Sequence, residues 1–242
     1  MNDLIINADD FGRSQSINKA IDYAFQSGII NRTTLMVSLP FVEEARAMAQ
    51  SHGYLDSIGL HLNLDLGTPM TEDIKRFGEF CNPDGTFNGA FRSERLGLGI
   101  RTNKALMEAV NEEVVAQMER YISLGLPAMH IDSHHHVHTK PFLQKMVLEL
   151  ARSYGFKTMR IARNMGGINV VKLYIKEFNN KAIRKRFSTT RFFGSYDDWR
   201  YSQPSGTSVE IMVHPDYIDG QYVDVLNYDK QLYRGLQEIK IL

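Results

Sequence analysis

The chain has a single cysteine, no excess charge of either sign and no long apolar run. Cys81 alone excludes an internal disulfide and any zinc site built mainly from cysteine. Lys and Arg number 28, and Asp and Glu also number 28, so the chain lacks the electrostatic signature of a general nucleic-acid binder. No apolar run approaches the ~18 residues that span a bilayer, and the amino terminus does not resemble a signal peptide. We therefore expect a cytoplasmic protein without nucleic-acid or membrane partners.

Other chemistries also lack their sequence signals. Gly166 and Gly167 do not stand between a strand and a helix in the way that a phosphate-binding loop requires. No histidine partner can be predicted for Cys81, which disfavours a nucleophilic role. The basic run formed by Lys181, Arg184, Lys185 and Arg186 is typical of the solvated face of a helix rather than of an anion site.

The order of apolar patterns predicts an α/β domain. The length of 242 residues suits one barrel-like domain of about 250 residues. Short β-branched or apolar runs alternate with segments of helical period. The runs are 4–6, 33–38, 58–64, 128–132, 158–162 and 209–213, and the helical segments are 16–27, 41–51, 104–124 and 141–154. This alternation predicts parallel strands with helices outside them, in one domain that spans residues 1–242.

Two long segments interrupt this alternation. Residues 65–103 are rich in Gly, Pro and Asn, and we expect a long loop there. Residues 164–206 contain an amphipathic helical pattern followed by an aromatic, polar stretch. Because loops of this size in compact domains are usually functional, both segments are predicted to be insertions that form walls over an active site.

Acidic or imidazole side chains stand at the carboxyl ends of four of the expected strands. Asp9 and Asp10 follow the first run, and His61 lies in the third. A cluster from His130 to His138 begins in the fourth run and continues beyond it, and His214 follows the last. In parallel α/β barrels, active sites are built at this face. Four such placements together favour a functional site over scattered core residues.

Each of these signals also has a structural interpretation. Two consecutive aspartates after a strand often form a turn or a helix cap, and a lone histidine such as His61 is often a core residue. His214 could be a simple strand end. Clustered imidazoles suggest a metal, but alternation along a strand sends neighbouring side chains to opposite faces. The five histidines between His130 and His138 cannot therefore all be ligands.

The set of residue types matches a mononuclear metal site. One carboxylate and two imidazoles bind a divalent ion and leave coordination positions for water and substrate. Such an ion lowers the pKa of water and polarises a carbonyl group, which suits hydrolysis of an amide or ester. A second carboxylate can then take a proton from water, and a histidine can protonate the leaving nitrogen.

Four motifs resemble those of the YdjC-like carbohydrate deacetylases, a family that includes the chitooligosaccharide deacetylases. They are residues 7–12 (NADDFG), 59–62 (GLHL), 130–138 (HIDSHHHVH) and 212–215 (MVHP), in the order of the family and spread over residues 1–220. The resemblance implies a distorted or incomplete (β/α) barrel with its active site at the carboxyl ends of the strands. It also implies a divalent metal and removal of acetyl groups from N-acetylated sugars, as in chitin degradation.

Carried onto this chain, the resemblance assigns roles to five residues. Asp10, His61 and His134 would bind the metal, Asp9 would be the general base and His214 the general acid. Members of the family are often described with magnesium. Two imidazole ligands instead favour zinc or another late transition ion, so both magnesium and zinc stay open.

Further residues are expected around the substrate. Phe11, Trp199 and Tyr217 could stack on sugar rings or serve only in packing. By strand alternation we expect His135 to point away from the metal, and His136 and His138 to lie behind the ligands or face the substrate. A phosphoesterase and a non-catalytic sugar- or metal-binding protein are the alternatives, although a phosphoesterase normally needs a second metal and more carboxylates. A homodimer is expected because it is the commonest assembly.

Overall fold

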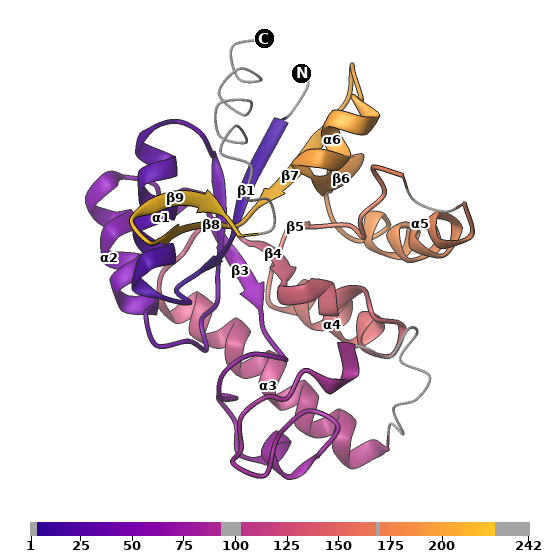
Figure 1. Ribbon diagram of the computed structural model, residues 1–242. Helices are drawn as coiled ribbons and strands as arrows, with labels where there is room; N and C mark the ends of the chain where they lie inside the picture. Colours follow the sequence, from indigo (N-terminus) through magenta and orange to yellow (C-terminus); the bar gives the residue numbers. More distant parts are fainter. Residues whose placement is uncertain (1–3, 93–102, 168–169, 226–242) are drawn as a thin grey trace.

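Seven parallel strands form a curled half-barrel in the computed structural model, which describes residues 4–92, 103–167 and 170–225 (Figure 1). The strands are β1 (Leu4–Phe11), β2 (Arg32–Leu35), β3 (Ile58–Leu62), β4 (His130–Ser133), β5 (Thr158–Met159), β6 (Phe192–Ser195) and β7 (Val209–Val213). They lie in the order β5-β4-β3-β2-β1-β7-β6, and every neighbouring pair is parallel. The fold class predicted from the sequence, an incomplete (β/α) barrel, is confirmed.

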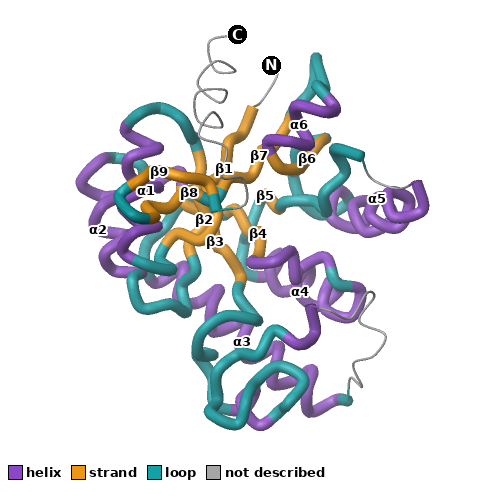
Figure 2. Tube along the Cα trace, viewed as in Figure 1, coloured by secondary structure: helices purple, strands orange, loops and turns teal. Residues whose placement is uncertain are grey.

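Helices pack around the sheet (Figure 2). They are α1 (Gln15–Gln26), α2 (Val42–His52), α3 (Lys104–Ser123), α4 (Pro141–Ser153), α5 (Val170–Arg184) and α6 (Tyr196–Ser202). The Ser14 hydroxyl caps α1 by accepting a hydrogen bond from the Ile17 amide, and Asn103 caps α3 in the same way. Within the described residues, no helix is both long and apolar enough to cross a membrane.

The strands alternate between an apolar face and a polar one. In β1, Ile6 and Ala8 belong to the hydrophobic cluster, whereas Asn7 and Asp9 enter a buried network of polar side chains. This alternation follows from the two-residue period of a strand. The half-barrel therefore has an ionic interior, and that interior supports the site described below.

Residues 164–206 are not an insertion. The amphipathic pattern forms α5 as predicted, but β6 joins the main sheet, with Phe192 paired to Val209 and Ser195 to Met212. β6 was not predicted because this strand has only four residues and contains a glycine. A hairpin of β8 (Pro215–Ile218) and β9 (Gln221–Asp224) was also not predicted.

Residues 65–92 form a loop with two short 3₁₀ turns, Asp73–Arg76 and Ala90–Arg92, as the composition indicated. The backbone amides of Met70 and Thr71 donate hydrogen bonds to the buried carboxylate of Glu113 in α3. The loop therefore packs on α3. The rest of the predicted loop, residues 93–102, lies outside the described residues.

Candidate active site

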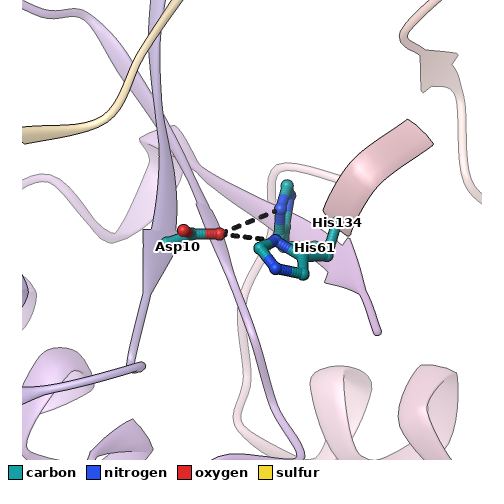
Figure 3. A group of neighbouring side chains, drawn as sticks. All are labelled: Asp10, His61 and His134. Atoms are coloured by element: carbon teal, nitrogen blue, oxygen red, sulfur yellow. Dashed lines mark ion pairs between the residues drawn. The ribbon is translucent and has the colours of Figure 1, made fainter. Parts of the chain in front are cut away.

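Asp10, His61 and His134 converge from three different segments of the chain. They lie on β1, on β3 and at the start of the 3₁₀ helix η4 (His134–Thr139), directly after β4. Oδ1 of Asp10 is 2.9 Å from Nδ1 of His134 and 3.4 Å from Nε2 of His61 (Figure 3). One ligand atom from each residue lies within 4.8 Å of the other two, so the group could hold a metal ion.

A β-bulge in β1 allows Asp9 and Asp10 to serve the same site. Between Ala8 and Phe11 the strand advances three residues while β2 advances two, from Thr33 to Leu35. Asp10 takes the left-handed backbone conformation, with φ of 71°. Adjacent strand residues normally point to opposite faces, and the extra residue breaks that rule here. Both carboxylates consequently line one cavity.

The geometry of the three residues fits a cation. Oδ1 of Asp10 and Nε2 of His61 are buried, and apart from the ion pairs given above neither atom makes a hydrogen bond. Nδ1 of His61 lies 2.7 Å from Oδ1 of Asp132, an arrangement that orients Nε2 toward Asp10. Burial lowers the pKa of His61, but the carboxylates of Asp132, Asp10 and Asp9 outweigh it and raise the pKa to about 10. The surrounding negative charge thus favours a positive charge at this point.

Arg160 occupies the space between the deeper carboxylates. It is fully buried and makes a two-pronged contact with Asp9, with both N···O distances at 2.7 Å. It also contacts Asp132 at 2.7 Å and Glu210 at 2.6 Å. Three further groups of described residues could hold a metal by spacing: Asp9–His61–Asp132, His130–Asp132–Glu210 and Asp65–His134–His135. The guanidinium already compensates the carboxylates of the first two groups. In the third group His135 is exposed and its Nδ1 already contacts Asp65 at 2.6 Å, so the fully buried group of Asp10, His61 and His134 is the better cation site.

Asp9 is held as an ionised, oriented carboxylate. Burial raises its pKa, but the Arg160 guanidinium, with His61 and His214, lowers the pKa well below the ordinary value. Asn7 also donates a hydrogen bond of 2.7 Å to Oδ1 of Asp9. Nε2 of His214 is 3.8 Å from Oδ2 of Asp9, so these two side chains lie close together.

These groups open into a cavity of about 630 Å³. Its lining residues are Asp9, Asp10, Arg13, Ser14, Ile17, His61, His134, His135, His136, Met212, His214, Pro215, Asp216 and Val225. The walls come from the start of α1 and from the hairpin that follows β7. Residues 65–92 and the described part of 164–206 contribute none of the lining, so the prediction that the two segments form the walls is wrong for these described residues.

A model of the YdjC-like protein family matches residues 3–242. The chain belongs to the YdjC-like family. It is 32% identical to a carbohydrate deacetylase of Geobacillus stearothermophilus over 98% of this chain and 88% of the relative. It is 33% identical to one of Brevibacillus brevis, over 99% and 90% of the two chains. A solved structure titled a putative cellobiose-phosphate cleavage protein from Enterococcus faecalis V583 has a TM-score of 0.73 at 26% identity, and covers 100% of this chain and 94% of its own.

The four histidines from His134 to His138 of this YdjC-like protein do not lie on a strand. After Ser133 the chain turns into η4, where His135 and His136 have φ of 47° and 57°. His135 lines the cavity, and its Nδ1 is 2.6 Å from Oδ2 of Asp65. His135 was expected to point away from the metal by strand alternation, but that alternation ends at Ser133. His135 lines the cavity and is not one of the three residues of the Asp10–His61–His134 group. His136 also lines the cavity, with its ring edge against Phe193.

The other expected substrate residues lie elsewhere in this YdjC-like protein. Phe11 is fully buried in the hydrophobic cluster, and His138 is 1% exposed. Trp199 stacks on Tyr196, and Tyr217 packs against Tyr222 in the hairpin. None of the four residues lines the cavity, so we no longer expect them to contact a bound sugar.

Three further residues support the site and were missed from the sequence. Asp132 orients His61, Arg160 holds Asp9, and Asp65 holds His135. Arg160 could have been found from the sequence, because a charged residue in the middle of the apolar run 158–162 indicates a buried ion pair. Asp65 had none, since an aspartate in a polar loop is ordinary.

The buried ring of His138 should make the stability of this YdjC-like protein depend on pH. Burial lowers the pKa of His138 from 6.5 to about 4. Between those values the unfolded chain binds a proton that the folded chain does not, so the free energy of unfolding falls as the pH drops, by about 3 kcal/mol over the full range. Urea unfolding at pH 7 and pH 4.5 should show a smaller loss in His138→Gln than in the wild type. Equal losses would contradict this assignment.

Proposed function

We propose that this chain is a metal-dependent deacetylase that removes the acetyl group from an N-acetylated sugar and releases acetate. The substrate class we propose is a chitooligosaccharide or another oligosaccharide that contains N-acetylglucosamine. One observation carries this proposal. Oδ1 of Asp10 and Nε2 of His61, two buried atoms that could bind a metal, lie in the same cavity as the ionised carboxylate of Asp9 and the ring of His214. The names of the curated relatives support the sugar as substrate.

Asp10, His61 and His134 would hold the ion. A divalent ion at this point would polarise the acetyl carbonyl and make water more acidic. The donor set of one carboxylate and two imidazoles favours zinc or another late transition ion, and magnesium is the alternative. Asp132 contributes by fixing the ring of His61 through the contact of 2.7 Å at Nδ1.

Asp9 and His214 would move the protons. Asp9 is ionised and lines the cavity, so it can accept the proton of the attacking water. The amine of the sugar leaves poorly as an anion, and His214 would protonate it. The separation of 3.8 Å between the two side chains lets both reach the same reacting amide. Arg160 keeps Asp9 oriented by its two contacts of 2.7 Å.

Acetate release from N,N′-diacetylchitobiose tests the proposal directly. Metal-stripped protein should be inactive, and one divalent ion added back at a time should restore activity. Asp10→Ala should bind less metal and stay inactive, because a ligand and a charge are lost together. Acetate release that survives metal stripping would contradict the proposal. Phosphate release from model esters without acetate release would favour a phosphoesterase, and tight sugar binding without turnover would favour a binding protein.

A further inference from the structure

A second polar cavity lies at the amino ends of the strands, opposite the candidate active site. Its volume is about 180 Å³, and we call it the amino-end cavity. Its walls come from the starts of β1, β2, β4, β5 and β7 and from the segment between α5 and β6. The lining residues are Ile5, Arg32, His130, Thr158, Met159, Ser188, Thr189, Thr190, Ser208 and Glu210. None of them lines the active-site cavity, so a ligand at this end would be separate from the reacting sugar.

The charged groups of the amino-end cavity favour an anion over a cation. The walls carry one guanidinium, one imidazole, five hydroxyl groups and a single carboxylate. That carboxylate belongs to Glu210, whose Oε1 is 2.6 Å from Nε of Arg160 and 2.7 Å from Nη2 of Arg32. Two guanidinium groups therefore compensate one carboxylate, and both would repel a cation. Arginine is well suited to hold carboxylate and phosphate groups.

His130 has a buried nitrogen that lacks an acceptor. Burial and the neighbouring Arg32 hold the pKa of His130 well below its ordinary value, so the ring is neutral. Nδ1 lies 2.9 Å from the hydroxyl of Thr158 and 3.5 Å from Nη1 of Arg32. Because a guanidinium can only donate, we assign Nδ1 as the acceptor, which places the ring proton on Nε2. Nε2 is buried and makes no hydrogen bond with any described residue, so this N–H needs an acceptor.

Thr190 and Arg32 supply further donors. Thr190 is only 7% exposed, and its buried Oγ1 has no partner in the described part of the chain. Nε of Arg32 donates to Oδ1 of Asn7 at 2.9 Å, and Nη2 is held by Glu210. Nη1 has only the long contact with His130 among the described residues. Buried donors without acceptors cost stability, so a ligand rich in acceptors would stabilise this end of the half-barrel.

We propose that the amino-end cavity binds a small oxyanion, a carboxylate or a phosphate ion, held by Arg32, His130 and Thr190. The oxygen atoms of such an ion carry several lone pairs close together, and hydrogen bonds to a charged partner are stronger than neutral ones. The volume is roughly six times the ~30 Å³ share of a water molecule in the liquid, which leaves room for an ion of this size. The other four hydroxyl groups of the walls can rotate to donate to the same ion.

Isothermal titration calorimetry with sodium acetate and with sodium phosphate tests the site, and sodium chloride is the control for ionic strength. At least one of the two ions should bind. Thr190→Val should weaken its binding by about 10-fold, because one hydrogen bond to a charged group is lost. Tighter binding of acetate would identify a carboxylate site, and tighter binding of phosphate would identify a phosphate site. If neither ion binds at about 10 mM, the cavity holds water only and the proposal is overturned.

The fold of Thr190→Val should be intact, since the hydroxyl that it removes has no partner among the described residues. Arg32→Lys is a second variant: it keeps a positive charge beside Glu210 but loses the planar fork, and it should also weaken binding. Arg13→Ala is the matched control, because Arg13 is a cation in the wall of the active-site cavity, and it should leave this binding unchanged. Loss of binding in Arg13→Ala but not in Thr190→Val would place the ion in the active site and overturn the proposal.

NMR of the histidine side-chain nitrogens locates the bound ion. The resonances of His130 are identified by their absence from the spectrum of His130→Gln. In the free protein they should show the proton on Nε2, and the Nε2 resonance should shift when the ion that binds in the calorimeter is added. A proton on Nδ1, or an Nε2 resonance that the ion does not move, would overturn the proposal.

Discussion

Asp9→Asn should lower kcat for acetate release by about 10²–10⁴-fold while the protein keeps its bound metal. The amide cannot accept the proton of the attacking water, although it has nearly the same shape as the carboxylate. Asp10 and the two imidazoles are unchanged, so metal content should equal that of the wild type. Initial rates on N,N′-diacetylchitobiose and metal analysis of the same sample provide the two measurements.

Glu210→Gln is a matched control for Asp9→Asn. It also removes one carboxylate charge from the Arg160 guanidinium, but Glu210 does not line the cavity. We expect the two variants to lose stability to a similar extent, because each leaves Arg160 less compensated in the interior. Only Asp9→Asn should lose most of its turnover. A comparable fall in kcat in both variants would show that Asp9 acts through the charge balance of Arg160.

His214→Ala should lower kcat on the amide substrate by about 10²–10⁴-fold with metal binding almost unchanged. His214 lies 3.8 Å from Asp9 and is not one of the three residues that converge on the cation site. Its backbone is fixed independently of its ring, because its amide donates a hydrogen bond of 2.7 Å to Asp224. Truncating the ring should therefore remove a proton donor without moving β7.

An activated acetyl ester separates protonation from structure. Its leaving group departs without a proton, so the ester should be much less sensitive to His214→Ala than the amide. Metal content and the urea midpoint should match those of the wild type. Equal losses on the amide and the ester would exclude His214 as the acid and would indicate a role in positioning the substrate.

The sequence predicted the parts of the site that depend on strand order. Parallel strands bring their carboxyl ends to one edge, so Asp10, His61 and His214 could be grouped from the runs that precede them. Strand alternation could not indicate which side chains line the cavity where the backbone leaves the regular pattern. His135 lines the cavity because η4 replaces the strand after Ser133.

Long-range partners were beyond the sequence pattern for a different reason. Arg160 contacts Asp9 across 151 positions of the chain, and no periodicity encodes such a pair. The aromatic residues that contact a sugar could not be predicted either, because an aromatic side chain next to a motif can serve packing as readily as binding. Phe11 follows Asp10 directly and is nevertheless fully buried.

The bulge in β1 places two consecutive residues, Asp9 and Asp10, in the same cavity. Because Asp9 and Asp10 are neighbours, one peptide unit with a Cα separation of 3.8 Å links the proposed base to the proposed ligand. Movements of helices or loops cannot change that spacing. Substitutions in the hairpin beyond β7 or at the start of α1 would therefore change the cavity wall without changing the spacing of Asp9 and Asp10. The register of one strand thus sets the spacing of the two carboxylates separately from the shape of the cavity wall.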